Sequence, residues 1–271
     1  MSDGNLSLIL CQQNITDMKF VGIIPARYAS TRFPGKPLAM IGGMTMIERV
    51  YRRASQALDE VVVATDDKRI IDAVAAFGGT AVMTSAAHRS GTDRCLEAYD
   101  IVASDADVVI NIQGDEPFIA PEQIATLMHC FDDTAVEIAT LARPFDPALG
   151  FEALFDSNKP KVVMDTAMNA LYFSRSIIPY VRNHPWQQWL EHQQFYTHIG
   201  LYGYRADTLR RIVALPQSPL ELAESLEQLR WLQAGIKIRV ALSGHQSVGI
   251  DTPADLEAAI ALLKECDNLK A

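Results

Sequence analysis

Short apolar runs alternate with amphipathic segments between residues 19 and 112. The apolar runs have the length of buried strands, and the segments between them carry apolar residues at helical spacing. Thr45 followed by Glu48 gives the first of these segments a capping-box start. Strands that alternate with helices predict an α/β fold with a doubly wound, mostly parallel sheet of the Rossmann-like kind. The expected strands span 19–25, 60–65, 80–84 and 107–112, with helices over about 45–58, 70–77 and 92–103.

The alternation changes after Arg143. Strand-like segments follow, and no stretch long enough for a crossover helix separates the first two. We therefore expect a small antiparallel β lobe inserted in the domain at about 144–205. The segment 183–197, with Trp186 and Trp189, should form a loop or a short helix within this lobe. The three strand-like segments are 161–165, 169–175 and 198–205.

Helical periodicity returns at Ser218, where proline occupies the first helical position and Glu221 completes a capping box. This pattern predicts one helix that reaches about Ala234. A strand over 237–242 and a terminal helix after Thr252 complete the expected fold. One face of the first of these helices would carry Glu224, Glu227 and Gln228, with Arg230 turned away.

The chain of 271 residues is long enough for one α/β domain with an inserted lobe. We expect this domain to span 18–271, and residues 1–17 to form a disordered leader because they show no periodicity. The apolar runs are too short to cross a bilayer, and a net charge of −9 argues against a broad nucleic-acid interface. The four cysteines have no CxxC spacing and no signal-peptide pattern is present, so the cytoplasm is the expected compartment.

Positive charge is concentrated in one window of this acidic chain. No acidic residue lies between Asp17 and Glu48, and a cationic loop over 25–37, PARYASTRFPGKP, directly follows the first strand. Ligands bind beyond the carboxyl ends of parallel strands, and cations, hydroxyls and a tight glycine turn suit a triphosphate. The loop matches neither GxGxxG nor a P-loop, and the alternative is a solvated surface loop. The candidate phosphate-binding residues are Arg27, Ser30, Thr31, Arg32 and Lys36, with Gly35 at the turn.

Two carboxylates also follow strands. Asp115 lies in NIQGDEPF after an apolar strand, where it can reach a hard cation such as Mg²⁺ whose other ligands are substrate phosphates. The alternative is an Asx turn before Pro117. Asp251 in VGIDTP is either a second carboxylate of the same metal site or an acid at a helix start.

These motifs occur in one order from Lys19 to the C-terminus: PARYASTRFPGKP, HRSGTDR, NIQGDEP, ALYFSR, HIGLYGYR and GIDTPADLE. Together they resemble the 3-deoxy-manno-octulosonate cytidylyltransferases, and HIGLYGYR with FSR and LEQLR is typical of this branch of the sugar nucleotidyltransferases. The resemblance implies a fold of the nucleotide-diphospho-sugar transferase type and an enzyme that transfers CMP from CTP to 3-deoxy-D-manno-octulosonate (KDO). It also implies Mg²⁺ as cofactor, a homodimer, and a role in activating KDO for lipopolysaccharide synthesis.

The resemblance further implies residue roles. Arg32 and Lys36 would lie closest to the reacting phosphate, and Asp115 and Asp251 would bind Mg²⁺, so these four form the expected catalytic set. The cytidine would lie against Ser90, Gly91, Thr92 and Arg94. The acidic sugar would be bound by Gln113, Arg175, His198, Tyr202, Glu227 and Gln228, with Arg175 and His198 facing its carboxylate. Taken alone, His198 would more often be a structural histidine and Glu227 a solvated helix residue.

Two alternatives share part of this pattern. A related transferase, such as a CMP-sialate synthetase or a uridylyltransferase, would have the same first loop but not HIGLYGYR with FSR. A non-catalytic nucleotide-binding regulator would keep the fold, but it would not need both Asp115 and Asp251.

Overall fold

The computed structural model describes residues 18–29, 33–245 and 249–268. The expected leader over 1–17, and Ser30, Thr31 and Arg32 of the cationic loop, lie outside the described residues. The strands of the main sheet are β1 (Phe20–Ala26), β4 (Glu60–Thr65), β5 (Thr80–Met83), β6 (Val108–Asn111), β7 (Ile138–Pro144), β8 (Lys161–Met164), β9 (Ala170–Ser174), β10 (Tyr196–Arg205) and β11 (Ile238–Leu242). A separate two-stranded hairpin consists of β2 (Met40–Ile41) and β3 (Met44–Thr45).

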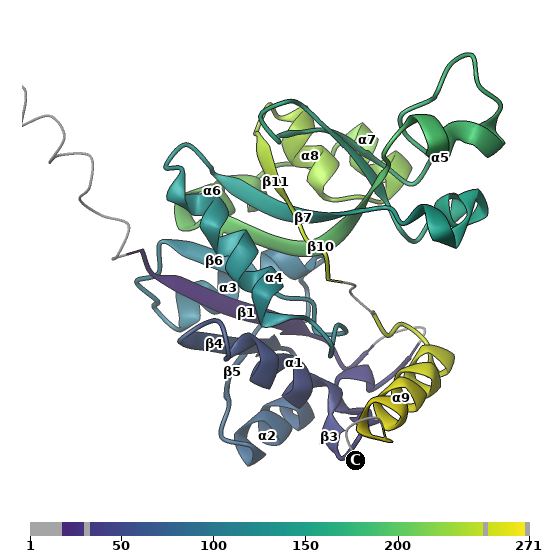
Figure 1. Cartoon of the computed structure of the whole chain (residues 1–271). Helices are drawn as coiled ribbons and strands as arrows, with labels where there is room; N and C mark the ends of the chain where they lie inside the picture. Colours follow the sequence, from purple (N-terminus) through teal and green to yellow (C-terminus); the bar gives the residue numbers. More distant parts are fainter. Residues whose placement is uncertain (1–17, 30–32, 246–248, 269–271) are drawn as a thin grey trace, which may run out of the picture.

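The main sheet runs in the order β11-β7-β10-β6-β1-β4-β5, with β8 and β9 attached beside β10 (Figure 1). The pairs β1–β4, β1–β6, β4–β5 and β7–β11 are parallel, whereas β10 is antiparallel to its neighbours. This arrangement confirms the predicted fold class. The helices are α1 (Met46–Ala54), α2 (Lys68–Ala76), α3 (Gly91–Ile101), α4 (Pro121–Met128), α5 (Trp189–His192), α6 (Ala206–Val213), α7 (Pro219–Glu224), α8 (Gln228–Gln233) and α9 (Pro253–Asn268).

Successive residues of β1 pack into two different cores, because side chains alternate between the two faces of a sheet. Ile23 packs with residues of α3, α6 and α8 on one face, and Ile24 packs with residues of α1, α2 and α4 on the other. All four residues of β6 are buried, which explains its continuous apolar sequence. Helices on both faces make the sheet doubly wound. The loops at the carboxyl ends of β1 and β6 lie at the edge of the sheet, where a ligand can bind.

The position of β10 differs from the sequence expectation. Its segment was assigned to the inserted lobe, but β10 lies in the main sheet between β6 and β7 and pairs with β8 only through Thr197 and Lys161. The strand β7 was not among the predicted strands. Local periodicity identifies a strand but does not say which partner it pairs with, so this arrangement was not readable from the pattern.

A lobe does project from the sheet, at the upper right of Figure 1. It contains the short helix α5, which lies in the segment expected to be a loop or short helix, whereas the antiparallel pair β8–β9 lies beside β10 and packs on the main core. The lobe has a small core of its own, formed by Phe145, Phe151, Leu154, Trp189 and Phe195.

The helix predicted from Ser218 to Ala234 is broken in two. The capping box at Ser218 is present, but α7 ends at Ser225, which has a left-handed backbone with a φ of 51°. The carbonyls of Glu224 and Ser225 accept hydrogen bonds from the Arg175 guanidinium, at 2.6 and 3.2 Å. Because the side chain of Arg175, the residue after β9, replaces helix amides as the donor, the helical repeat does not continue.

The expectation that Arg230 turns away from the polar face was wrong. Its guanidinium forms two hydrogen bonds with the buried Glu221 carboxylate, at 2.7 and 2.9 Å, and approaches Glu227 Oε1 at 3.4 Å. Burial raises the pKa of Glu221, but the contacts with Arg230 and the Ser218 amide outweigh this and leave it below its ordinary value.

Arg230→Met should lower the free energy of unfolding by about 3 kcal/mol, because it leaves the Glu221 carboxylate buried without its cation. Urea denaturation measures this difference. Arg210→Met is the matched control, since it breaks an exposed pair with Asp100 and should cost about 1 kcal/mol or less. Equal losses in the two variants would contradict the assignment of a structural pair to Arg230 and Glu221.

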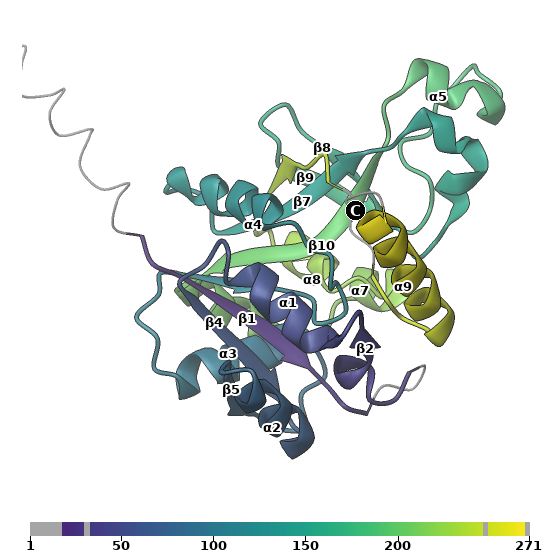
Figure 2. The same cartoon turned by 60° about the horizontal axis from the view of Figure 1, so that its bottom comes forward.

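Figure 2 shows α9 returning to the β2–β3 hairpin. Leu256 and Ile260 of α9 pack there around buried Ile41 and Ile250. No helix in the described part of the chain has both the length and the apolar composition to span a membrane.

Candidate active site

The cationic loop begins at the carboxyl end of β1 and folds back on itself at Gly35. Gly35 has a φ of 71°, and its amide donates to the Tyr28 carbonyl at 2.9 Å. A Cβ at this position would lie 3.2 Å from the Tyr28 ring. Glycine is therefore required by both conformation and space, and the turn delivers Lys36 to the edge of the sheet.

Lys36 lies between the two carboxylates that the sequence singled out. Its ammonium donates to Asp115 Oδ2 at 2.7 Å and to Asp251 Oδ1 at 3.1 Å. The Lys36 side chain is only 14% exposed, whereas the side chains of Asp115 and Asp251 are 31% and 46% exposed, so the carboxylates remain accessible to a ligand. Three residues separated widely in the sequence thus meet at one point, as predicted.

Close backbone packing holds the two carboxylate loops together. The Ile250 amide donates to the Asp115 carbonyl at 2.9 Å, and Ile250 itself is fully buried. A Cβ at Gly114 would lie 2.8 Å from the Pro25 carbonyl oxygen, so only glycine lets the loop after β6 approach the end of β1 so closely. Thr252 and Asp255 then form a reciprocal cap at the start of α9, which fixes the chain just after Asp251.

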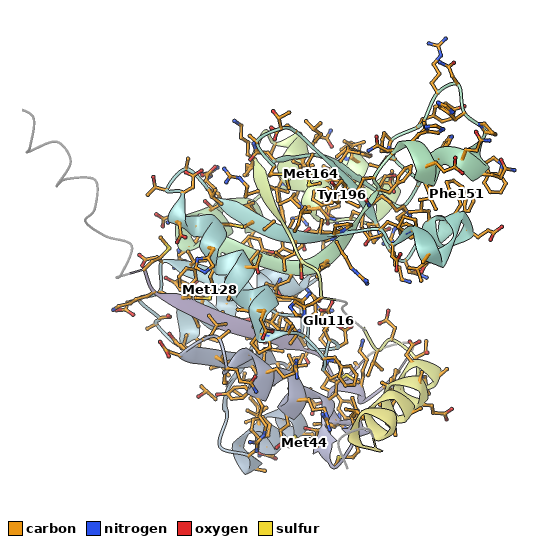
Figure 3. The ribbon with its side chains drawn as sticks, viewed as in Figure 1. Met44, Glu116, Met128, Phe151, Met164 and Tyr196 are labelled. Atoms are coloured by element: carbon orange, nitrogen blue, oxygen red, sulfur yellow. The ribbon has the colours of Figure 1, made fainter. Side chains whose placement is uncertain are left out.

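A cavity of about 440 Å³ opens at this cluster. Its lining is rich in charged groups and exposed backbone, which suits an anionic ligand more than an apolar one. Figure 3 shows Glu116, the neighbour of Asp115, in the middle of the molecule, and Phe151 in the distant lobe. Among the described residues the cavity is lined by Pro25, Ala26, Arg27, Ala29, Lys36, Pro37, Gln113, Gly114, Asp115 and Asp251.

The donor set fits Mg²⁺. Two carboxylates that contact one ammonium are close enough to share one cation, and Mg²⁺ commonly takes one or two protein carboxylates with phosphates and water as its other ligands. The described residues contain no cluster of three or more His, Cys, Asp or Glu side chains that would suit a metal bound by protein alone. A metal held by Asp115 and Asp251 would take its other ligands from a phosphate substrate and water.

The HRSGTDR segment lies beside this cavity. A Cβ at Gly91 would lie 3.4 Å from Pro25 and 3.9 Å from Asn111 Nδ2, so the start of α3 touches the ends of β1 and β6. Arg27 donates to the His88 carbonyl, which ties the cationic loop to this segment. Ser90 caps α3 through a reciprocal bond with Asp93.

Two residues of this segment do not face the cavity. The Arg94 side chain is fully buried and donates to Thr84 at 2.6 Å and to Asp66 at 3.0 Å. It has no exposed atom for a nucleotide, so the expected contact between Arg94 and the cytidine is not supported. Thr92 is 2% exposed, and its hydroxyl donates to Glu227.

The structure brings together most of the residues expected to bind the sugar. Gln113 lines the cavity, and its amide donates to the Gly200 carbonyl of β10 at 3.0 Å. Tyr202 of β10 pairs in register with Asn111, the last residue of β6, and its ring lies 5.3 Å from that of His198. The middle of β10, from His198 to Tyr202, thus lies beside the segment that leads from β6 to Asp115.

Buried polar atoms without a hydrogen bond gather at this place. Such atoms are rare, because a buried polar group without a hydrogen bond destabilises the fold by about 1–3 kcal/mol. A ligand or an ordered water that supplies the missing hydrogen bond explains them. The Asn111 carbonyl oxygen and the Gln228 amide nitrogen are two of them. Sequence reasoning missed part of the group. Asn111 and Tyr204 lie inside the motifs NIQGDEP and HIGLYGYR, and Trp231 directly follows LEQLR, but none of the three carries a charge to single it out. The members are Asn111 Oδ1, Tyr202 Oη, Tyr204 Oη, Gln228 Nε2 and Trp231 Nε1.

His198 is a neutral hydrogen-bond acceptor in this network. Burial lowers its pKa to about 3, so the imidazole carries no charge near neutral pH. The Thr140 hydroxyl donates to the Leu201 carbonyl at 2.9 Å and therefore accepts the proton of His198 Nε2, 3.0 Å away. Assigned in this way, Nδ1 has a free lone pair, which suits a sugar hydroxyl and is at odds with the expected contact to a carboxylate.

Arg175 lies away from this cluster. Besides its bonds to Glu224 and Ser225, its guanidinium donates to the Ser157 carbonyl at 2.7 Å. It lines a different cavity, of about 730 Å³, among aromatic residues of the lobe such as Trp186. The structure thus assigns Arg175 a role in joining the lobe to the turn before α8, and it does not bring Arg175 to His198.

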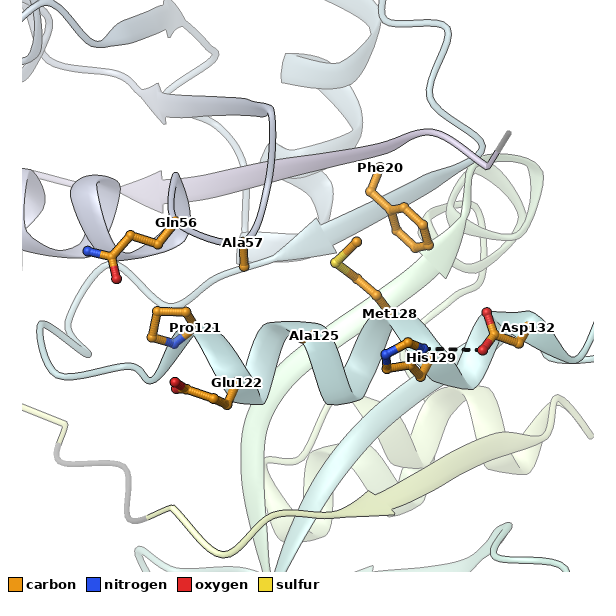
Figure 4. A pocket seen from close by; sticks show the side chains of 9 residues that line it. All are labelled: Phe20, Gln56, Ala57, Pro121, Glu122, Ala125, Met128, His129 and Asp132. Atoms are coloured by element: carbon orange, nitrogen blue, oxygen red, sulfur yellow. Dashed lines mark hydrogen bonds and ion pairs between the residues drawn. The ribbon is translucent and has the colours of Figure 1, made fainter. Parts of the chain in front are cut away.

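A further cavity of about 440 Å³ lies at the opposite end of β1, beside Phe20 (Figure 4). Its lining contains none of the predicted site residues, and the ion pair drawn there joins His129 and Asp132 at 3.2 Å. Because ligands of parallel sheets bind at the carboxyl ends of strands, the cluster around Lys36 is the better candidate.

Comparisons with known proteins agree with this geometry. The family model for Cytidylyltransferase matches residues 21–238. A 3-deoxy-manno-octulosonate cytidylyltransferase of Phocaeicola vulgatus is 61% identical over 248 residues, which cover 92% of this chain and 98% of the relative. The protein of the same name from Bacteroides thetaiotaomicron is 59% identical over 247 residues, or 91% of this chain and 99% of the relative. A solved structure of CMP:2-keto-3-deoxy-manno-octonic acid synthetase complexed with CTP matches with a TM-score of 0.84 and 46% identity, covering 91% of this chain and 99% of the other.

Proposed function

The chain belongs to the cytidylyltransferase family, and we propose that it is the enzyme that transfers CMP from CTP to KDO with release of pyrophosphate. The observation that carries this proposal is the position of Gln113 between the two parts of the site. Gln113 lines the charged cavity, and its amide also bonds to β10, the strand that carries the unpaired hydroxyls of Tyr202 and Tyr204. A charged cavity for a triphosphate directly beside a polar cluster for a sugar is what transfer between the two requires.

In the proposed reaction the anomeric hydroxyl of the sugar attacks the α-phosphorus of CTP. A new P–O bond forms, the bond to pyrophosphate breaks, and the hydroxyl proton is released. Lys36 and Arg27 stabilise the negative charge on the phosphoryl oxygens, and Arg32 is proposed to join them. Asp115 and Asp251 would hold Mg²⁺, which would supply positive charge at the phosphates and lower the pKa of a hydroxyl bound to it.

On the sugar side, the chain provides donors and acceptors that suit hydroxyl and carboxylate groups. Tyr202 and Gln228 have buried donors without a partner, whereas His198 Nδ1 and the Glu227 carboxylate are acceptors. Burial raises the pKa of Glu227, and the Thr92 hydroxyl opposes this effect. These groups orient the attacking hydroxyl by hydrogen bonds, and the protein needs no covalent intermediate.

The lobe is the proposed dimer interface. Tyr180 is 75% exposed, with Phe155 and Trp186 also exposed beside the aromatic cavity. Apolar groups gathered on one lobe are typical of an interface, and a homodimer would cover them. Sedimentation of the purified protein tests this state. A CTP-dependent reaction also favours the cytoplasm, where it would supply activated KDO for lipopolysaccharide synthesis.

A pyrophosphate-release assay with CTP and a panel of acidic sugars tests the proposed function. We expect release that depends on both CTP and KDO and that requires Mg²⁺. Release with a sialic acid in place of KDO would favour the related CMP-sialate synthetase activity. Binding of CTP without release for any sugar would indicate a nucleotide-binding regulator.

Arg175→Met should raise the Michaelis constant for the sugar about thirtyfold, equivalent to about 2 kcal/mol, and leave that for CTP unchanged. The variant keeps the apolar stem but removes the bonds that hold the turn between α7 and α8, on which Glu227 depends. Titrations of each substrate at saturating levels of the other measure the two constants.

Arg182→Met, an exposed arginine of the same lobe, is the control and should change neither constant. A loss of CTP affinity in Arg175→Met with an unchanged constant for the sugar would place Arg175 on the nucleotide side and contradict this map.

A further inference from the structure

Hydrogen bonds to Glu227 join the segment beside the nucleotide cavity to the start of α8 in the sugar cluster, and the Ser90 and Thr92 side chains both take part. The Thr92 hydroxyl donates to Glu227 Oε2 at 2.8 Å, across 135 residues of sequence. Thr92 is 2% exposed, so its hydroxyl is directed into the protein and not toward a ligand in the cavity.

The two ends of this bond are rigidly placed on opposite subsites. Thr92 lies in the first turn of α3, one residue after Gly91, which touches Pro25 at the nucleotide cavity. Glu227 immediately precedes α8 and is next to Gln228, one of the unpaired groups of the sugar cluster. The bond therefore links the start of α3 directly to the Glu227 carboxylate.

The Thr92 hydroxyl is closer to this carboxylate than the Arg230 guanidinium is, and the Ser90 side chain also bonds to it. Arg230 approaches Glu227 Oε1 at 3.4 Å, but its shorter bonds, at 2.7 and 2.9 Å, go to Glu221. A carboxylate has about four acceptor sites, so Glu227 can accept these bonds and still accept a hydroxyl of a ligand. Thr92 thus fixes the orientation of the Glu227 carboxylate and leaves an acceptor site of that carboxylate open for a ligand.

We propose that Thr92 is a positioning residue that holds Glu227 for the sugar and so couples CTP binding to sugar binding. This inference rests on the proposed function and assigns Thr92 a role different from the expected contact with cytidine. CTP that presses against the start of α3 fixes Thr92, and the fixed hydroxyl holds Glu227 in its sugar-binding orientation. Because coupling between two ligands is reciprocal, bound sugar must strengthen CTP binding by the same factor.

Thr92→Val tests this role, because valine has nearly the same shape and lacks the hydroxyl, and Thr92→Ser is the matched control that restores the donor. The dissociation constant of CTP is measured with and without a saturating analogue of the sugar that lacks the attacking anomeric hydroxyl. In the wild type and in Thr92→Ser the analogue should tighten CTP binding several-fold. In Thr92→Val this ratio should fall close to one, CTP binding to the free enzyme should stay the same, and the Michaelis constant for the sugar should rise about tenfold or more.

Two results would overturn the proposal: an unchanged coupling ratio in Thr92→Val, or weaker CTP binding to the free variant, which would make Thr92 a nucleotide contact. Absence of coupling in the wild type would also overturn it. Glu227→Gln and the double variant give an independent check, because the double variant should lose no more sugar affinity than Glu227→Gln alone, and additive losses would show separate roles. Failure of the wild type to turn over KDO would instead refute the proposed function, so the two failures are distinct.

Discussion

Asp115→Asn and Asp251→Asn should each abolish turnover while leaving the melting temperature near that of the wild type. Each change keeps the volume of the side chain but removes one of the two negative charges that converge on the Lys36 ammonium. A bound divalent ion contributes several kcal/mol to the stabilisation of charge in the transition state. Loss of that contribution corresponds to a decrease in kcat on the order of a thousandfold.

The measurements are initial rates of pyrophosphate release across a range of Mg²⁺ concentrations, together with thermal unfolding. Asp72→Asn is the matched control, since that carboxylate is exposed and pairs with Lys68 on the surface of α2. Rates near wild type for either site variant at saturating Mg²⁺ would show that the carboxylates do not hold the metal. The backbone bond between Ile250 and Asp115 does not involve either carboxylate, so the loops should stay in place.

Local signals predicted the elements that position the site. The apolar runs gave β1, β4 and β6, and the Thr45 side chain accepts from the Glu48 amide as the capping-box pattern requires. These features depend on neighbours within a few residues, so they can be read from the sequence. The convergence of Lys36 with Asp115 and Asp251 also followed from a general rule, because loops after parallel strands meet at one edge of a sheet.

The errors concern interactions between residues far apart in the sequence. The resemblance implied a contact between Arg94 and the cytidine, but the buried Arg94 guanidinium pairs with Asp66 inside the protein. Likewise, the Arg175 guanidinium donates hydrogen bonds to backbone carbonyls of the turn that interrupts the predicted long helix. Which partner an arginine takes depends on the tertiary structure, and neither periodicity nor residue type contains that information.

The unpaired buried groups are the reverse case: they belong to the candidate site in the structure, but the sequence did not point to them. The residue types of Asn111, Tyr204 and Trp231 do not mark these positions as functional, because each type is also found in strands or in the protein interior. In the structure, the lack of a hydrogen bond at their polar atoms marks them as members of the cluster beside Gln228. A site of this kind becomes visible only when hydrogen bonds can be counted.

Lys36→Met should lower kcat by at least about a hundredfold with both substrates saturating. The ammonium is placed among the carboxylates at the end of β1, where the phosphates of CTP would bind, and its interaction is strongest with the charge that develops at phosphorus. Methionine keeps most of the apolar stem, so the Gly35 turn and the packing of the loop should remain. The Michaelis constant for the sugar should not change, because the Lys36 ammonium contacts the two carboxylates and lies outside the polar cluster around Gln228.

Cation binding separates the role of Lys36 from that of the carboxylates. In the free enzyme the Lys36 ammonium binds the same carboxylate oxygens that a divalent ion would use. The variant Lys36→Met should therefore bind Mn²⁺ as tightly as the wild type or more tightly. The variant Asp115→Asn should bind Mn²⁺ more weakly, because it removes a negative charge. Titration of Mn²⁺ followed by electron paramagnetic resonance measures both variants, and Lys68→Met, an exposed lysine paired with Asp72, is the control. A Lys36→Met variant that keeps its kcat would show that the ammonium does not act on the phosphates. One that loses both kcat and Mn²⁺ binding would show that Lys36 serves to arrange the carboxylates, and the separate role proposed for it in stabilising the transition state would be wrong.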